Sequence, residues 1–421
     1  MQSAKRVVIL GQGYVGLPVS VRAVEAGFDV VGFDVDEQRV AALAEGCSFI
    51  DDIGDAELAE ALSTGRFRVT ADTADLAGFD VAVVSVPTPL RQGVPDLGYI
   101  ESAAGLLAPH VRPGCCVVLE STTYPGTTED VFVPRLEAGS GLRAGADFAV
   151  GYSPERIDPS NPTWNLRNTP KIVAGIDDAS LDAVDAFYSA LVDTTVRVSG
   201  VREAELAKLL ENTFRHVNIA LVNELAMYTN ELGIDVWEVV DAAATKPFGF
   251  MKFTPGPGVG GHCLPIDPSY LSWQVRQALG RAFRFVELAN DVNEHMPDFV
   301  VSRVVAKLNA ARKALNGSRV FVLGLAYKKN SGDARESPAI AVVDRLLRGG
   351  AEVVAADPLV LPPYVPSGVT VVPFDAAELD RADVVVVLTD HDEFDWAAVA
   401  KVADKVLDTR HRLADTNAET L

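Results

Sequence analysis

Residues 6–16 read RVVILGQGYVG, a short apolar run followed by three glycines in the spacing GxGxxG and by the start of a helical pattern. A strand that passes through such glycines into a helix is typical of dinucleotide sites. The glycines permit a tight turn, a close approach of the backbone to a pyrophosphate, and close packing of the helix on the strand. We expect a dinucleotide to contact this unit at Gly11, Gly13, Tyr14, Val15 and Gly16.

An acidic residue, Asp34, ends the next predicted strand at residues 30–34. Its carboxylate can accept hydrogen bonds from ribose hydroxyls and repels a 2′-phosphate, which favours NAD over NADP. Arg39 follows shortly afterwards and weakens this preference. The expected cofactor is NAD, bound in part by Asp34 and Arg39.

The charge of the chain excludes some classes of partner. Its 421 residues include 58 Asp and Glu against 37 Lys and Arg, a formal net charge of -21. This charge opposes nucleic acid or an anionic membrane as a general partner, although one cleft can still bind a small anion. The scattered cysteines, the histidines without metal spacing and the absence of a signal or membrane-spanning run favour a cytoplasmic protein without a bound metal.

Short β-branched runs alternate with helical patterns in the first part of the chain, which is typical of a parallel sheet with helices on both faces. The runs lie at residues 7–10, 30–34, 81–86 and 116–120. Residues 203–232 then form one long helical pattern. After Ser318 the alternation of strands and helices returns.

The two ends of the chain resemble copies of one plan. Segments 6–11, 29–34 and 80–85 correspond to segments 319–324, 351–357 and 383–388. Common ancestry and the shared physics of α/β domains both explain such an echo. We therefore predict an α/β protein with two doubly wound Rossmann-like domains, joined by a central helical domain with one long helix.

Residues with hydroxyl groups end two later strands, at the edge where doubly wound sheets bind ligands. These ends read VPTP at residues 86–89 and ESTT at residues 120–123. Pro87, Thr88, Ser121 and Thr122 can contact the cofactor or a bound water. They can equally form turns and helix caps, and the sequence leaves both interpretations open.

The segment GPGVGGHCLPIDP, residues 256–268, is the most unusual in the chain. Its glycines bring backbone amides close to another group, and Cys263 follows them in a loop that offers little core. Such a thiol can act as a nucleophile when positive charge or amides stabilise the thiolate. Together with a nicotinamide, it suggests oxidation of a thiohemiacetal to a thioester, which water hydrolyses to an acid.

Lys208 and Asn212 stand four residues apart and therefore on one face of the long predicted helix. A cation and an amide at this spacing match the stabilisation of one oxyanion. An ordinary solvated helix face is the alternative interpretation.

With these residues the chain resembles a known family, the nucleotide-sugar 6-dehydrogenases, which act on UDP-glucose, UDP-N-acetylglucosamine and UDP-N-acetylmannosamine. The resemblance covers nearly the whole chain and rests on specific motifs. They are GQGYVGLP at residues 11–18, VPTP at 86–89, ST at 121–122, SPER at 153–156, Lys208 with Asn212, GGHC at 260–263 with Asp267, GLAYKK at 324–329 and RES at 335–337.

This resemblance implies a four-electron oxidation of the C6 alcohol to a carboxylate, with two NAD per sugar and no release of the aldehyde. It implies an NAD domain, a dimerisation region with the cysteine loop and a UDP-sugar-binding domain, which we place at residues 1–200, 201–300 and 301–421. The implied partners are a UDP-sugar or other nucleotide-sugar substrate and further copies of the chain, in a homodimer or higher homo-oligomer.

The resemblance also implies roles for single residues. Cys263 carries the thiohemiacetal and the thioester, and Lys208 and Asn212 stabilise the oxyanion, helped by a water that Thr122 and Asp267 hold. Glu155 acts in water activation, with the choice of carboxylate base left open. Lys328 contacts the nucleotide, and Arg335 lies near the cofactor. The expected substrate contacts are Glu155, Arg156, Lys208, Asn212, Gly258, Gly260, Gly261, His262 and Lys328.

Two departures from the UDP-glucose branch bear on the sugar. That branch usually has Ser before the cysteine and Pro-Lys-Asp after it, where this chain has His262 and LPID at residues 264–267. It also usually has a second Glu where this chain has Pro159. Both features, with KPFGF at residues 246–250, look like the N-acetylhexosamine branch. UDP-N-acetylglucosamine is therefore the first choice, and UDP-glucose, UDP-N-acetylmannosamine and a dTDP-sugar are alternatives.

Two other functions stay open as more distant alternatives. A two-electron 3-hydroxyacid-type dehydrogenase shares the Rossmann start and the helical second domain, but it needs neither Cys263 nor a third α/β domain. A silent NAD-binding sensor would have no chemical reason to keep Lys208, Asn212, Cys263 and Asp267.

Overall fold

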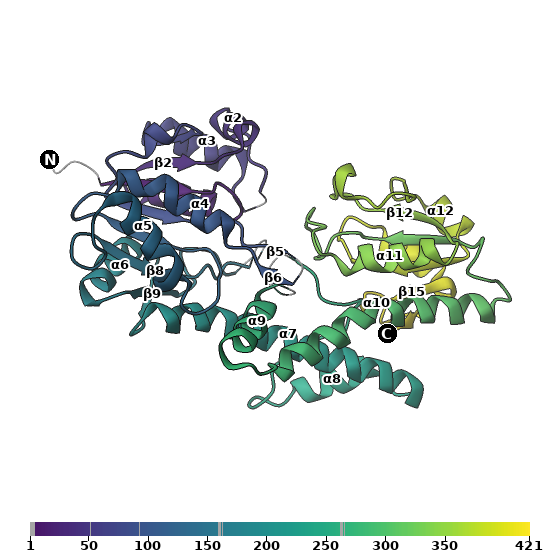
Figure 1. Cartoon of the computed structure of the whole chain (residues 1–421). Helices are drawn as coiled ribbons and strands as arrows, with labels where there is room; N and C mark the ends of the chain where they lie inside the picture. The colour runs from purple at the N-terminus through teal and green to yellow at the C-terminus, as the bar shows by residue number, and fades with distance from the viewer. Residues whose placement is uncertain are drawn as a thin grey trace. The chain divides into compact units, whose positions relative to one another are not determined.

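The computed structural model describes residues 5–50, 52–91, 93–158, 161, 163–261, 264 and 266–421. The chain divides into two compact units, Met1–Glu211 and Asn212–Leu421. Their boundary lies within the long helix α7 (Val201–Leu232) (Figure 1). The three-domain division expected from the sequence stays a prediction.

The first unit is built on a sheet with the strand order β10-β9-β8-β7-β4-β1-β2-β3, parallel except where β9 runs against β8. The strands are β1 (Arg6–Leu10), β2 (Asp29–Phe33), β3 (Phe67–Thr70), β4 (Val81–Val84), β7 (Cys116–Leu119), β8 (Ala149–Tyr152), β9 (Lys171–Gly175) and β10 (Thr195–Arg197). The helices are α1 (Gly16–Glu25), α2 (Glu37–Ala44), α3 (Asp55–Ser63), α4 (Gly98–Leu107), α5 (Val133–Ser140) and α6 (Asp178–Leu191), and β5 (Leu90–Arg91) and β6 (Val94–Pro95) form a hairpin.

Both faces of this sheet are covered, because successive residues of a strand point to opposite faces. Val8 and Leu10 of β1 pack with residues of α4 and α5. Val7 and Ile9 pack with residues of α1, α3 and α6 on the other face. The near-continuous apolar runs in the sequence are therefore explained by burial on both sides.

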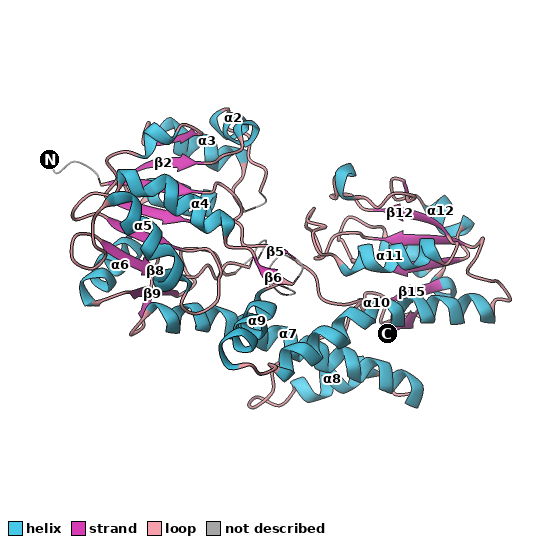
Figure 2. Cartoon of the chain, viewed as in Figure 1, coloured by secondary structure: helices cyan, strands magenta, loops and turns pink. Residues whose placement is uncertain are grey.

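The second unit contains a fully parallel sheet with the order β13-β12-β11-β14-β15-β16. The strands are β11 (Arg319–Leu323), β12 (Glu352–Ala356), β13 (Thr370–Val371), β14 (Val384–Val387), β15 (Val406–Asp408) and β16 (Glu419–Thr420). The helices are α8 (Val236–Ala244), α9 (Asp267–Leu279), α10 (Arg284–Ala310), α11 (Pro338–Arg348), α12 (Ala376–Arg381) and α13 (Trp396–Ala400). Helices α10 and α11 cover one face of this sheet, and α12 and α13 cover the other. Figure 2 labels α10, α11 and α12 beside the sheet.

The remaining helical segments are single turns. They lie at Thr73–Leu76, Ala108–His110, Thr128–Phe132, Pro362–Tyr364 and Ala403–Lys405. No helix in the part of the chain described above combines the length and the hydropathy needed to cross a bilayer.

The predicted fold class is confirmed, and the echo between the two ends is a real structural correspondence. In each sheet the first strand lies between the second and the fourth of the Rossmann order. Arg6 and Arg319 each donate their backbone N–H to an aspartate at 2.8 Å, Asp80 in the first sheet and Asp383 in the second. The long helix is also confirmed, since α7 runs without interruption over the predicted residues.

We expect Gly11→Ala to lower the free energy of unfolding by about 2 kcal/mol or more. Gly11 has a φ of +88°, which costs an ordinary residue about 1–2 kcal/mol. In addition, a Cβ there would lie 2.3 Å from the carbonyl oxygen of Ser85. Chemical denaturation followed by circular dichroism measures the change. Gly13→Ala is the matched control, because no atom lies within 4 Å of its Cβ position. Equal transition midpoints for the two variants would contradict this explanation.

Candidate active site

The glycine turn after β1 leaves room for a pyrophosphate. A Cβ on Gly16 would lie 1.7 Å from the carbonyl oxygen of Gly11, whereas a Cβ on Gly13 would point into open space. Helix α1 begins at this turn without a side-chain cap and without an acidic residue in its first turn. Its first N–H groups and its positive dipole end therefore suit an anionic group, and the turn fits the expected dinucleotide.

Asp34 lies beside this turn and is nearly buried. Its Oδ2 accepts the backbone N–H of Gln12 at 2.8 Å and contacts Nη1 of Arg39 at 2.9 Å, while Oδ1 accepts the N–H of Asp36 at 3.0 Å. The Arg39 that the sequence analysis set against the acid is thus its ion-pair partner. The carboxylate is fixed at the sheet edge where a ribose would lie next to the glycine turn.

The loops after β4 and β7 are joined by a hydroxyl group. Ser121 Oγ accepts the N–H of Val86 at 2.9 Å and donates to its carbonyl oxygen at 2.8 Å. This side chain therefore ties the two strand ends together. Thr88 is buried, whereas Pro87 is exposed and Thr122 is partly exposed.

Helix α7 carries the expected oxyanion ligands, and the structure adds a partner for one of them. Lys208 is nearly buried, and Asn212 follows one turn later on the same helix face. Asn212 donates from Nδ2 to Oδ2 of Asp267 at 2.5 Å. Asp267 is the buried first residue of α9, so two residues 55 positions apart are brought together.

Glu155 is held by backbone and side-chain donors after β8. Its Oε1 accepts the N–H groups of Arg156 and Ile157, at 2.6 and 2.5 Å. Its Oε2 lies 3.3 Å from Nζ of Lys171. The neighbouring Arg156 turns away to form an ion pair with Glu211 at 2.7 Å.

The glycine-rich loop at residues 256–261 packs its backbone against other parts of the second unit. A Cβ on Gly260 would lie 2.6 Å from Pro338 Cδ and 2.9 Å from Tyr327 Cβ, and one on Gly261 would lie 2.9 Å from the Tyr327 ring. Gly258 approaches Pro338 and the carbonyl oxygen of Asn293. The sequence predicted that these glycines bring the backbone close to another group, and part of that group is the protein chain itself. His262 and Cys263 lie outside the described residues.

The loop after β11 carries the two residues expected at the nucleotide and the cofactor. Lys328 is partly exposed there. The guanidinium of Arg335 forms two hydrogen bonds to the carboxylate of Asp333, at 2.9 and 2.6 Å. Arg335 is thereby fixed within the second unit.

Asp357 follows β12 as Asp34 follows β2, but donors from the protein chain occupy the hydrogen-bonding positions of its carboxylate. Backbone N–H groups and the buried ring of one histidine donate to it. The donors are Leu325 N, Ala326 N, Leu359 N, Val360 N and His391 Nε2. Burial works against ionisation, but these hydrogen bonds outweigh it and lower the pKa of Asp357 to about 2.

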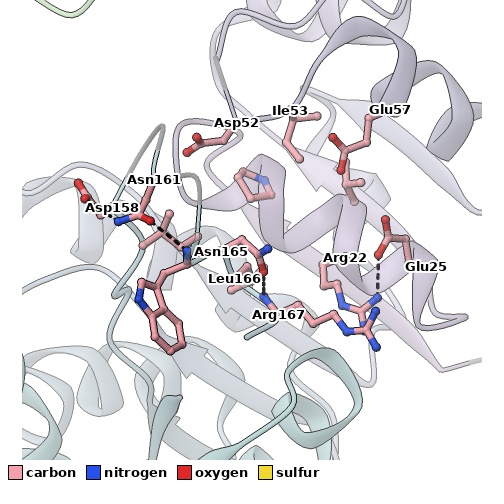
Figure 3. Close-up of a pocket in the computed structure, with 14 residues that line it drawn as sticks. Arg22, Glu25, Asp52, Ile53, Glu57, Asp158, Asn161, Asn165, Leu166 and Arg167 are labelled. Carbon is pink, nitrogen blue, oxygen red and sulfur yellow. Dashed lines mark hydrogen bonds and ion pairs between the residues drawn. The ribbon is translucent and has the colours of Figure 1, made fainter. Parts of the chain in front are cut away.

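A cavity of about 380 Å³ lies elsewhere in the first unit, between α1, the start of α3 and a stretch of chain that includes Asp158, Asn161 and Arg167 (Figure 3). Its charged groups are partly paired, since Arg22 contacts Glu25 at 2.7 Å. No residue expected at the cofactor or the substrate is among the described residues that line it. Among all the residues that the structure describes, no group of three or more His, Cys, Asp or Glu is able to hold a metal ion.

Three charged residues at these sites were not predicted from the sequence. Lys171 and Glu120 lie behind Glu155, and each stands at the end of an otherwise apolar strand, which is a signal that could have found them. Arg410 is half-buried after β15. Its Nε donates to the carbonyl oxygen of Leu388 at 2.7 Å, and its Nη1 lies 3.1 Å from a Cβ placed on Gly256. No local pattern pointed to it.

Comparison with known proteins identifies the three parts of the chain. Residues 5–192 match the NAD binding domain of the UDP-glucose/GDP-mannose dehydrogenase family, residues 202–295 its central domain, and residues 321–418 its UDP binding domain.

Relatives with different substrates in their names are about equally similar. UDP-N-acetyl-D-mannosamine dehydrogenase of Pyrococcus horikoshii is 36% identical over 94% of this chain and 92% of its own length. UDP-N-acetyl-D-glucosamine 6-dehydrogenase of Pseudomonas aeruginosa is 36% identical over 92% and 91%. The structure of a UDP-glucose dehydrogenase from Pyrobaculum islandicum superimposes with a TM-score of 0.89 at 28% identity, covering 99% of this chain and 97% of that one.

The matches extend over nearly the whole chain, in sequence and in fold. The chain belongs to the UDP-glucose/GDP-mannose dehydrogenase family, and it is an NAD-dependent nucleotide-sugar dehydrogenase.

Proposed function

We propose that this enzyme oxidises the C6 alcohol of UDP-N-acetylglucosamine to a carboxylate, in a four-electron reaction that passes through a thiohemiacetal and a thioester on Cys263. The observation that carries the proposal is the hydrogen bond between Asn212 and Asp267. It joins the polar face of α7 to the start of α9, four residues after Cys263 in the sequence.

NAD fits the first unit, and when bound it supplies the acceptor for the hydride that leaves C6. The open space at Gly13 and the uncapped start of α1 suit its pyrophosphate. Asp34 suits a ribose, with Arg39 as its ion-pair partner. Thr88 and Thr122 lie on loops at the same sheet edge, where they can contact the nicotinamide half.

The oxyanion that forms when the Cys263 thiolate attacks the C6 aldehyde needs donors, and Lys208 and Asn212 can supply them from successive turns of α7. Asp267 fixes the amide of Asn212, so its orientation is set before substrate binds. Thr122 and Asp267 are proposed to hold the water that assists them. Glu155 is proposed to activate the water that hydrolyses the thioester.

The second unit is proposed to bind the nucleotide of the substrate. Its loops at residues 256–261 and 324–329 pack against each other through Tyr327. Tyr327 directly precedes Lys328 in the sequence, so the glycine-rich segment lies close to the part of the chain that carries Lys328. Arg410 adds a cation next to Gly256, which suits a diphosphate. Arg335 is held by Asp333 and is proposed to reach toward the cofactor.

The choice of an N-acetylated sugar rests on His262, on Pro159 and on the names of similar proteins. The relatives include dehydrogenases of UDP-N-acetyl-D-mannosamine and UDP-N-acetyl-D-glucosamine at the same identity. UDP-N-acetylmannosamine is therefore the nearest alternative, followed by UDP-glucose and a dTDP-sugar. A cytoplasmic location is also proposed, because Cys47, Cys115 and Cys116 form no disulfide.

We further propose a homodimer formed through α7. Apolar side chains at helical spacing are exposed along this helix, and such a stripe needs a partner in water. They are Leu206, Leu210, Phe214, Leu221, Leu225, Tyr228 and Leu232.

The first test is the ratio of NADH formed to nucleotide sugar consumed by the purified enzyme. We expect two NADH per sugar, because alcohol and aldehyde are each oxidised once. The highest kcat/KM among UDP-N-acetylglucosamine, UDP-N-acetylmannosamine, UDP-glucose and dTDP-glucose identifies the sugar. A ratio of one would refute the four-electron reaction, and no NADH with any of them would favour the two-electron rival.

Cys263→Ala should abolish formation of the acid while leaving the Kd for NAD nearly unchanged, because the thiol carries the covalent step and has no part in cofactor affinity. Steady-state assays and calorimetry measure the two quantities. Cys47→Ala is the matched control, since this exposed thiol has no proposed role. Full activity of Cys263→Ala would exclude the thioester route.

Leu221→Glu should convert the dimer to a monomer, because it places a charge in the centre of the apolar stripe. Light scattering at micromolar concentration measures the mass. Leu361→Glu is the control, since Leu361 is also 62% exposed but lies outside α7. A wild-type enzyme that is already monomeric would refute the proposed interface.

A further inference from the structure

Two charged side chains with no part in the proposed reaction lie directly behind Glu155. Glu120 follows β7 and Lys171 begins β9, and their side chains are 0% and 3% exposed, against 12% for Glu155. Replacing a buried ion pair by apolar residues is often neutral or stabilising. The contribution of this pair to stability is therefore a weak explanation for two such charges at the ends of apolar strands.

The contacts of Lys171 place Glu155 between two sets of donors. The three N–H groups of the Lys171 ammonium face Glu120, the carbonyl oxygen of Pro154 at 3.0 Å and Oε2 of Glu155 at 3.3 Å. Oε1 of Glu155 accepts the two backbone N–H groups that follow it. The carboxylate is therefore fixed from both sides.

Fewer groups hold Glu120 than Glu155: Lys171 contacts one of its oxygens, and the Tyr188 hydroxyl lies near enough to lower its pKa. Among the described residues its Oε2 has no hydrogen-bond partner. The two carboxylates share one ammonium in a buried place, and the ring of Tyr188 lies over that ammonium at 5.1 Å. When both are ionised, the three side chains carry a net negative charge that the protein must bury.

We propose that Lys171 and Glu120 are positioning residues for Glu155: Lys171 aims the carboxylate, and the charge of Glu120 sets how strongly Lys171 acts on it. This inference rests on the proposed role of Glu155 in thioester hydrolysis. When Glu120 is ionised, Lys171 is shared between two carboxylates, and Glu155 is the stronger base. When Glu120 is protonated, the whole charge of Lys171 acts on Glu155 and makes it a weaker base.

Glu120 is the group in this cluster that titrates near neutral pH. Burial raises its pKa to about 7, against the attraction of Lys171. Burial also raises the pKa of Cys116 in β7 to about 12 and that of Tyr188 in α6 well above its usual range, so both stay neutral. Burial lowers the pKa of Lys171, but the two glutamates outweigh it, so the ammonium persists. Arg156 follows Glu155 in the chain after β8, but its guanidinium is directed away from the cluster and paired with Glu211 of α7.

In the wild-type enzyme the rate of thioester hydrolysis should rise as the pH passes upward through about 7, because the ionised form of Glu120 is the one that leaves Glu155 the stronger base. In Glu120→Gln this inflection should be absent, and hydrolysis at pH 8 should be slower by about tenfold. Two readouts measure it: the slow phase after a burst of two NADH per protomer, and the acyl-enzyme seen by intact mass after acid quench. An unchanged rate and inflection would overturn the proposal.

Glu205→Gln is the matched control for the pH profile. Glu205 lies in α7, is also buried, and has its pKa raised to about 7 by burial against hydrogen bonds from Thr128. Its carboxylate accepts the backbone N–H groups of Gly126 and Thr128. The inflection should therefore persist in this variant. If the inflection is lost in Glu205→Gln but persists in Glu120→Gln, it belongs to Glu205 and not to Glu120, and the proposal is overturned.

Substitutions of Lys171 separate its charge from its packing. Lys171→Met should slow hydrolysis at pH 7 by about 100-fold and move the profile to higher pH, because two carboxylates then face each other without a cation. Lys171→Arg should restore most of the rate, since the guanidinium keeps the charge and the donors. If Lys171→Met does not fold, the hydrolysis rates of Lys171→Arg and Glu120→Gln still test the proposal. A folded Lys171→Arg enzyme that hydrolyses as slowly as Lys171→Met would overturn the proposal.

These outcomes are distinct from those that test the proposed function. A wild-type enzyme that forms no NADH from any nucleotide sugar would refute the proposed function, and this inference with it. A wild-type enzyme that forms two NADH per sugar, with variants that hydrolyse as it does, would refute only the roles of Lys171 and Glu120.

Discussion

The ligand-binding edges of both sheets depend on one hydrogen bond, from the backbone N–H just beyond the first strand to the carboxylate that ends the second. Gln12 donates to Asp34 at 2.8 Å in the first sheet, and Leu325 donates to Asp357 at 2.6 Å in the second. The bond closes the turn over the neighbouring strand, so it fixes where the chain leaves the sheet. The loops after β1, β4 and β7, which carry proposed cofactor contacts, and the loop after β11, which carries Lys328, start at these two edges.

The carboxylates of the proposed site are oriented by neighbours rather than by solvent. Asp267 accepts a hydrogen bond from the amide of Asn212 and is the first residue of α9. Glu155 is held by two backbone N–H groups and Lys171. Because these donors are in place before substrate arrives, little reorganisation is needed during the reaction.

The strands, the long helix and the glycine turn could be predicted because each has a local signature: burial on both faces, a period of 3.6 residues, and GxGxxG between strand and helix. The site was harder to predict where partners are distant in the sequence. Nothing local indicated that Gly260 and Gly261 approach Tyr327, or that Arg410 reaches Gly256. The two interpretations of Ser121 differed only in its partner, which the fold reveals as the backbone of Val86.

Asp357 shows why one topology can serve two ligands. Five donors from the chain surround the carboxylate of Asp357 in the described structure, whereas fewer donors surround the carboxylate of Asp34. An acid at the end of the second strand can thus serve the architecture of one domain and remain available for ligand recognition in the other. For protein engineering, this means that turning the second domain into a dinucleotide site would require redesigning the His391 loop before any glycine motif is introduced.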